Sequence, residues 1–197
     1  MSISTLEKYL PPNTLPFLKK WFGSHVIHIR ITRDRHSKLG DYRKERDGSH
    51  QITVNSTLDP YLFFFVLTHE LAHLIAFHDY GFRIGPHGKE WKHTFRLMLL
   101  DSLEVYPEDL QLILKRFSVS PKANFMSSPD LVRYFNEGTY EEEIFYVEDI
   151  PQGQEFEYRN HLYMVEGKRK KNYLCKQLNS GKQYVFSPLV QVRQIKN

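Results

Sequence analysis

The sequence predicts an α+β protein in two parts. A three-stranded antiparallel sheet and several helices should surround one long apolar helix, and a small all-β module should follow. Three observations support this prediction. Residues 61–77 are almost continuously apolar, yet they contain titratable side chains. The preceding segment holds short runs rich in β-branched residues, which favour strands. After residue 151 the chain changes to short alternating runs separated by turn residues.

The predicted sheet comes first along the chain. A β-branched run over residues 24–33 predicts the first strand, and Leu39–Tyr42 begins a second one. Asp47-Gly48 is a strong signal for a hairpin turn, so residues 50–55 should return beside the second strand. We therefore expect three antiparallel strands before the apolar helix.

The helices have recognisable start and stop signals. Asp59-Pro60 supplies an N-cap and a proline for the first turn, so the apolar helix should begin there and run to about Tyr80. Because it is apolar nearly all round, it should be buried in the centre of the domain. Further helices are expected over residues 88–103 and 107–117.

The apolar helix carries the pattern His-Glu-x-x-His at His69, Glu70 and His73. Residues four apart lie on one face of an α-helix, so both imidazoles can approach the same metal ion. Glu70 lies beside them, where it can take a proton from a water at the metal. A catalytic zinc ion usually has three protein ligands and one open position, so a third ligand must come from elsewhere in the chain.

A second motif, Gly85-Pro86-His87-Gly88, follows shortly after the helix. Its glycines and proline should turn the chain back, so that His87 stands at the start of the next helix and can face the first. The two motifs together, His-Glu-Leu-Ala-His and Pro-His-Gly-Lys-Glu-Trp-Lys, resemble the SprT-like (Spartan-related) zinc metalloproteases over roughly residues 24–100. The resemblance implies a zincin-like catalytic domain with His87 as the third ligand. Asp79 and Glu90 remain alternative third ligands.

We predict from these residues a zinc-dependent metallopeptidase that binds one Zn²⁺ and hydrolyses polypeptides. Glu70 would be the catalytic base, and the metal ligands would be His69, His73 and His87. A further group usually stabilises the oxyanion, and the sequence leaves it open, with Tyr42, Arg83 and His93 as candidates.

Two other classes of function fit parts of the pattern. The chain could be a non-catalytic nucleic-acid-binding or scaffold protein with a structural zinc site, or it could hydrolyse small amides. A match to His-Glu-x-x-His also arises by chance in some sequences. Glu70 favours an enzyme, because a structural zinc site needs no carboxylate beside an open position. Charged groups inside an apolar helix would also be costly without a function.

Charge is distributed unevenly along the 197 residues, although the net charge is only +4. The chain is basic up to about residue 125, acidic over the next 25 residues, and basic again to its end. We predict a protease domain over residues 1–122, an acidic linker over 123–150 and a small basic β module over 151–197. The acidic run Glu141–Glu143 is either a solvated segment or a competitor of nucleic acid for a basic surface.

The C-terminal module contains the only cysteine, Cys175, which excludes an internal disulfide and a cysteine-rich zinc site. Many SprT-like proteins carry a zinc ribbon with paired cysteines at this place, so the module should be an SH3-like barrel or a degenerate ribbon. The basic run Lys168-Arg169-Lys170-Lys171 falls at a predicted turn. It could contact phosphates, or it could simply be a solvated hairpin tip. DNA is expected as a partner chiefly because the family resemblance implies it.

The N-terminal segment Met1–Pro12 is too polar for a signal peptide, and the longest apolar run is interrupted by His69 and Glu70. We therefore expect a cytoplasmic protein that does not bind membranes.

Overall fold

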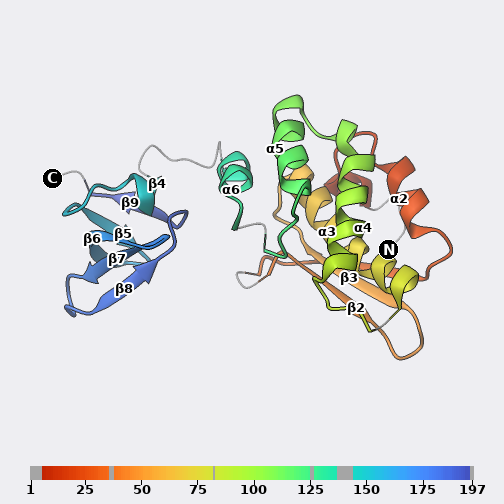
Figure 1. Ribbon diagram of the computed structural model, residues 1–197, viewed down its shortest axis with the longest axis horizontal. Coiled ribbons are helices and arrows are strands. Elements are labelled where there is room, and N and C mark those ends of the chain that lie inside the picture. Colours follow the sequence, from red (N-terminus) through yellow and green to blue (C-terminus); the bar gives the residue numbers. More distant parts are fainter. Residues whose placement is uncertain (1–5, 36–37, 82, 125–126, 137–143, 196–197) are drawn as a thin grey trace. The chain divides into compact units, whose positions relative to one another are not determined.

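The computed structural model describes residues 6–35, 38–81, 83–124, 127–136 and 144–195 (Figure 1). The chain divides into two compact units, Met1–Leu131 and Val132–Asn197. Helix α6 (Pro129–Asn136) spans this division. The boundaries predicted from the sequence lie near residues 122 and 150. The acidic run Glu141–Glu143 lies outside the described residues.

The sheet of the first unit has three strands, β1 (Ile27–Thr32), β2 (Gly40–Lys44) and β3 (His50–Asn55), in the order β1-β3-β2. Strands β2 and β3 form an antiparallel hairpin, as the Asp47-Gly48 turn predicts. Gly48 has a φ of 86°, a left-handed conformation that glycine adopts without steric cost. Because β3 lies in the middle of the sheet, β2 is one of its two open edges.

The expectation of a fully antiparallel sheet is wrong for β1. This strand pairs with β3 in parallel, with Ile29 opposite Ile52. The short connection after β1 leads to β2 at the far edge, and β3 then returns between them. Since β1 and β2 run in opposite directions, β3 must be antiparallel to β2 and parallel to β1. Side chains alternate in both kinds of pairing, so the sequence pattern did not distinguish them.

The helices of the first unit are α2 (Leu15–Phe22), α3 (Pro60–Tyr80), α4 (Lys89–Asp101) and α5 (Glu108–Ser118). The bounds of α3, α4 and α5 agree closely with the predicted ranges. Short 3₁₀ helices occur at Glu7–Tyr9 and Leu103–Val105.

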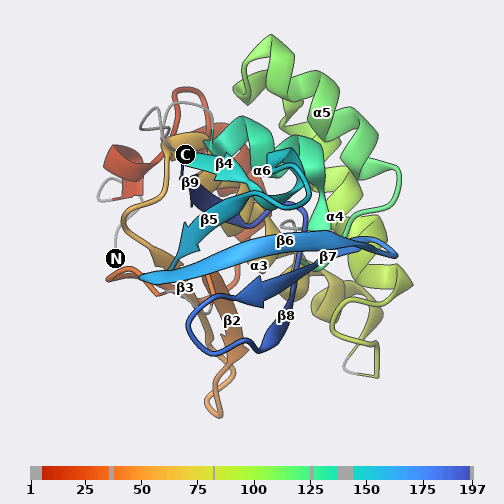
Figure 2. The ribbon, with the colours of Figure 1, turned by 90° about the vertical axis from the view of Figure 1, so that its left-hand side faces the viewer.

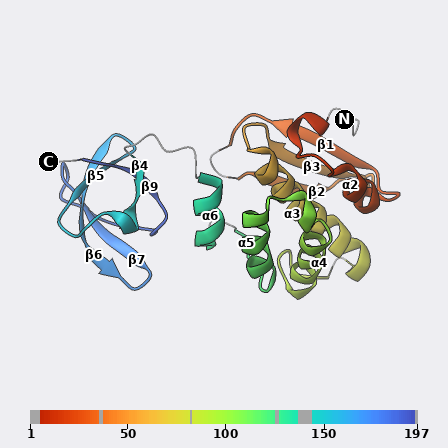
Figure 3. The ribbon, with the colours of Figure 1, turned by 90° about the horizontal axis from the view of Figure 1, so that it is seen from above.

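Helix α3 lies between the sheet and α4, and α4 packs in turn on α5 (Figures 1 and 3). Because both of its sides are covered, α3 buries residues around its whole circumference, including Phe63, Phe64, Leu67 and Leu71 at 0% exposure. The helix is long and apolar enough to cross a membrane, but 72% of its apolar window is buried inside the protein. Its apolar side chains therefore contact other protein side chains.

The second unit is a curled, six-stranded antiparallel sheet in the order β4-β9-β5-β6-β7-β8 (Figures 2 and 3). Its strands are β4 (Ile144–Tyr146), β5 (Glu155–Tyr158), β6 (His161–Arg169), β7 (Asn172–Gln177), β8 (Gln183–Phe186) and β9 (Gln191–Gln194). Arg159 and Asn160 both have positive φ, as a two-residue hairpin turn between β5 and β6 requires. The sheet thus begins upstream of residue 151, at β4.

A compact apolar cluster fills the second unit. Its buried members are Val147, Ile150, Phe156, Tyr163, Val165, Cys175, Phe186 and Val192. Cys175 is fully buried, and burial raises the pKa of its thiol to about 11. The single cysteine is therefore a packing residue.

The start of α3 is stabilised by the side chain of Asp59, which accepts hydrogen bonds from the backbone N–H groups of Tyr61 (2.9 Å) and Leu62 (3.4 Å). We predict that Asp59→Ala lowers the free energy of unfolding of the first unit by about 1 kcal/mol. Asp59→Asn should retain most of the stability because asparagine also caps helices. Denaturant unfolding followed by tryptophan fluorescence measures this, since Trp21 and Trp91 both belong to the first unit. Equal stability of the two variants would contradict the capping role.

Candidate metal centre

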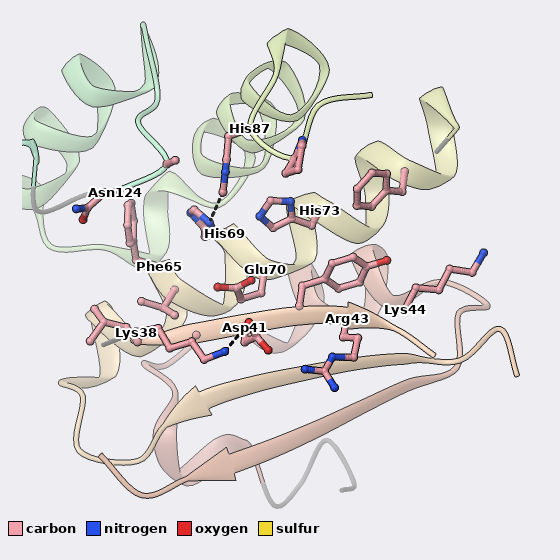
Figure 4. Close-up of a pocket in the computed structure, with 17 residues that line it drawn as sticks. Lys38, Asp41, Arg43, Lys44, Phe65, His69, Glu70, His73, His87 and Asn124 are labelled. Atoms are coloured by element: carbon pink, nitrogen blue, oxygen red, sulfur yellow. Dashed lines mark hydrogen bonds and ion pairs between the residues drawn. The ribbon is translucent and has the colours of Figure 1, made fainter. Parts of the chain in front are cut away.

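Three histidines meet at one point of the first unit. His69 and His73 belong to α3, and His87 precedes α4. Their potential ligand atoms all lie within 4.8 Å of one another, and the Nε2 atoms of His69 and His87 are 3.3 Å apart. Figure 4 shows the three rings turned toward one another, with Glu70 next to them. Tetrahedral zinc with Zn–N bonds of ~2.05 Å would hold two nitrogens about 3.3 Å apart, so the arrangement fits one ion.

Local sequence explains why His87 reaches the other two histidines. Gly81 ends α3 with a φ of 80°, and the backbone N–H of Gly88 donates to the carbonyl of Gly85 at 3.0 Å. This turn brings the chain back over α3. The ring of His73 also hydrogen-bonds the backbone of Pro86. Since proline has no N–H, the imidazole donates to the Pro86 carbonyl, a contact of the kind that orients metal-binding histidines.

Trp91 packs against the whole histidine cluster from the side of α4. Its ring centroid lies 4.7 Å from that of His69, 5.3 Å from that of His73 and 4.6 Å from that of His87. The indole is fully buried, and Phe95 contacts His69 from the same helix. These contacts restrict the rotation of the imidazoles before any ion binds.

Burial keeps the histidines neutral at physiological pH. It lowers the pKa of His69 to about 3 and that of His73 to about 4, and the neighbouring imidazoles add to the effect. The pKa of His87 is also lowered by burial. Neutral imidazole offers a nitrogen lone pair, which is the form that binds metal ions.

The carboxyl of Glu70 is buried, with only 7% of the residue's surface exposed. Burial raises the pKa of its carboxyl to about 8, and the negative charge of Asp41 adds to the rise. Lys38, Arg35 and a hydrogen bond from the backbone N–H of Tyr42 act in the opposite direction. A cation bound next to this group would favour its ionised form.

Strand β2 approaches Glu70 so closely that only glycine fits at position 40. A Cβ atom there would lie 2.6 Å from Glu70 Oε1 and 2.7 Å from Val66 Cγ1. Sequence reasoning missed this constraint, because a glycine that begins a strand gives no sign of what faces it.

A cavity of about 970 Å³ opens beside the histidines and follows β2 (Figure 4). Residues 38–44 form one wall, α3 forms the floor, and Ala123 and Asn124 close one end. Sequence reasoning also missed these last two residues, which lie in the segment after α5 that carries no motif.

The backbone of β2 contributes hydrogen-bonding groups to this cavity. Leu39 accepts a hydrogen bond from Asn55, and Glu45 donates one to Ser49, so alternate residues of β2 pair with β3. The intervening residues Gly40, Tyr42 and Lys44 direct their N–H and C=O groups to the open edge. The N–H of Tyr42 is the one that reaches Glu70.

The alternative third ligands are not part of the cluster, which among the described residues consists of the three histidines alone. Asp79 instead contacts the ring of His78 at 3.1 Å, and Glu90 lies 3.9 Å from Lys89. Both contacts are with immediate sequence neighbours. His87 is therefore the residue that the fold brings to the metal-binding pattern.

Of the three oxyanion candidates, only Tyr42 lines the cavity. Its ring stacks on that of His73, with centroids 5.9 Å apart and planes 9° apart, while its hydroxyl contacts His50 Nδ1 at 3.0 Å. Burial raises the pKa of this hydroxyl to about 12, so it stays protonated. Arg83 and His93 are exposed and lie outside the cavity lining.

The predicted nucleic-acid residues belong to the second unit. Lys168, Arg169, Lys170 and Lys171 are all exposed at the turn that joins β6 to β7. The ammonium of Lys168 lies 5.7 Å from the ring centroid of Tyr173.

Residues 17–105 match the model of the SprT-like family. This segment is similar to the SprT-like family. It contains Glu70 and all three clustered histidines, whereas α5 and the second unit lie outside it. The resemblance found in the sequence is therefore confirmed, and it is consistent with a metallopeptidase-like function. No curated protein and no solved structure matches the chain significantly.

The close approach at Gly40 yields a test of the site's packing. Gly40→Ala should force β2 away from α3 and lower the free energy of unfolding by about 1–3 kcal/mol. Gly85→Ala is the matched control, since a Cβ there meets no atom closer than 3.8 Å. Denaturant unfolding compares the two variants. Equal stability of Gly40→Ala and the parent protein would show that the strand yields without cost.

Proposed function

We propose that the chain is a zinc-dependent metallopeptidase whose first unit is a zincin-like catalytic domain. The observation that carries this proposal is the convergence of His69, His73 and His87 beside the buried carboxyl of Glu70, at a cavity that follows an open strand edge. Three neutral imidazoles with a fourth position open suit Zn²⁺ in a catalytic site.

The residues of the chain fit the chemistry of peptide hydrolysis. When bound, Zn²⁺ would supply Lewis-acid polarisation of the scissile carbonyl and would lower the pKa of the attacking water. Glu70 would accept the proton of that water at a carboxylate oxygen and pass it to the leaving amine. The N–H of Tyr42 would hold the carboxylate in place during the transfer.

The edge of β2 offers a way to bind the substrate backbone. An extended polypeptide could pair as an additional strand with the outward groups of Gly40 and with the carbonyl of Tyr42, whose N–H is already bonded to Glu70. Such a chain would pass directly over Glu70, because the edge itself contacts this carboxylate. The length of the cavity along the strand favours a polypeptide over a small amide.

Glu70→Gln tests the proposed catalysis. The variant keeps the size and most of the polarity of the side chain but cannot accept the proton, so kcat should fall at least about a hundredfold. Zinc content should remain near one equivalent because no ligand is altered. Proteolysis of an unfolded protein substrate measures the rate, and metal analysis measures the zinc.

His87→Ala provides the complementary variant, since it should lose zinc and activity together. Zinc binding by the parent protein without any cleavage, together with unchanged properties of Glu70→Gln, would instead support the structural zinc site of a scaffold protein. Cleavage of small amides but not of polypeptides would assign another substrate class.

For the second unit we propose an SH3-like module that binds nucleic acid and directs the peptidase to DNA-bound proteins. Strands β5 to β8 form a meander and β9 returns to β5, a strand order that supports the SH3-like interpretation. Four exposed cations at the β6–β7 turn support binding to phosphates.

Salt dependence tests the nucleic-acid proposal. The combined variant Lys168→Gln, Arg169→Gln, Lys170→Asn and Lys171→Gln removes the four charges, and asparagine tolerates the positive φ of 56° at position 170. Binding of labelled single-stranded DNA should weaken, and the slope of log affinity against log salt should become shallower by roughly 2–3. An unchanged slope would mean that this turn does not contact phosphates.

A further inference from the structure

We propose that the cavity selects polypeptides that carry acidic residues before the cleaved bond and an apolar residue directly after it. This inference rests on the proposed peptidase function and assigns the substrate class of the same cavity. It follows from three features: the unequal composition of the two cavity ends, the direction of β2, and the alternation of its side chains.

The end of the cavity near the start of β2 is apolar and carries no net charge. Phe65 and Val66 of α3 are 2% and 5% exposed, and Leu39 and Ala123 complete the recess. The cation at this end, Lys38, forms an ion pair with Asp41 at 2.8 Å. This end therefore suits an uncharged, apolar side chain.

The opposite end, near the end of β2, is cationic. Arg43 and Lys44 are both exposed there, next to Tyr42 and Phe77. Figure 4 shows these two cations on the far side of Glu70 and the histidines from Phe65 and Asn124. A substrate crossing the cavity would thus meet positive charge on one side of the scissile bond and an apolar recess on the other.

The direction of β2 decides which side comes first in the substrate. An added strand pairs somewhat more stably in the antiparallel direction. An antiparallel substrate would place its N-terminal part beside Lys44 and its C-terminal part beside Gly40. Residues before the cleaved bond would then lie at the cationic end, and the residue after it would enter the apolar recess next to Val66.

Because side chains of β2 alternate between its two faces, the cationic end extends over two substrate positions. Gly40 faces Glu70, and Tyr42 stacks on α3, so Lys44 lies on the same face as these two. Arg43 lies on the opposite face. Two consecutive substrate residues, whose side chains also alternate, would each be near one cation.

Peptide binding to the zinc-loaded full-length Glu70→Gln variant tests this inference without turnover. Three labelled peptides of equal length are compared by fluorescence anisotropy. The first has two glutamates followed by leucine, the second has two lysines followed by leucine, and the third has the first sequence reversed. The first should bind best, by about two- to fivefold for each ion pair. Its advantage should shrink at high salt.

Charge reversal at the cationic end should reverse the preference. Arg43→Glu with Lys44→Glu, added to Glu70→Gln, should favour the lysine peptide. Lys115→Glu with Arg116→Glu is the matched control, since these adjacent, exposed cations lie on α5 outside the cavity lining and should leave the order unchanged. Equal binding of the first two peptides, or an order unaffected by reversal at positions 43 and 44, would overturn the acidic preference. Better binding of the reversed peptide would overturn the antiparallel direction.

A separate variant tests the apolar recess. Ala123→Phe should fill the recess and weaken binding of the first peptide relative to a peptide with alanine in place of leucine. Ser120→Phe, at an exposed position outside the lining, should leave this ratio of affinities unchanged. An equal effect of both variants would overturn the assignment of the recess. Cleavage of the first peptide by the parent protein is measured in parallel. Selective binding without cleavage would support the selectivity and contradict the peptidase function. Cleavage without selective binding would support the peptidase function and contradict the selectivity.

Discussion

The first unit is organised around the burial of ionisable groups inside an apolar helix. Helix α3 is covered on both sides, yet it carries the buried Glu70 and His73 and the half-buried His69. Moving such groups out of water is costly unless they are neutral, paired or bound to a metal. Three features of the surrounding structure offset this cost. The imidazoles are neutral, the edge of β2 donates a hydrogen bond to the carboxyl, and a third histidine comes from outside the helix.

The same constraint explains how the other elements are placed. The sheet edge must come within hydrogen-bond distance of Glu70, which requires glycine at position 40. The chain must reverse directly after α3 so that His87 reaches the cluster, which Gly81 and the turn from Gly85 to Gly88 permit. Helix α4 then presents Trp91 to all three imidazoles. The position of each of these elements is thus tied to the geometry of one buried centre.

Much of this arrangement could be predicted from the sequence because local signals were strong. The spacing of His69 and His73 alone predicts that both imidazoles share one helix face, and Asp59-Pro60 marks the start of α3. The convergence of His87 agrees with the family resemblance. The parallel pairing of β1 could not be predicted, since it depends on where β3 inserts. Ala123 and Asn124 reach the cavity through the tertiary path of the chain after α5, which leaves no periodic signal.

The contacts of Trp91 have a spectroscopic consequence. The chain contains two tryptophans, and Trp21 stacks on Phe64 instead of the histidines. Trp91 is thus an intrinsic fluorophore in contact with the three clustered imidazole rings. Paramagnetic ions such as Cu²⁺ or Co²⁺ in this position would quench its emission, whereas closed-shell Zn²⁺ would not. Occupancy of the centre could therefore be followed optically in the unlabelled protein, by competition between a quenching ion and zinc.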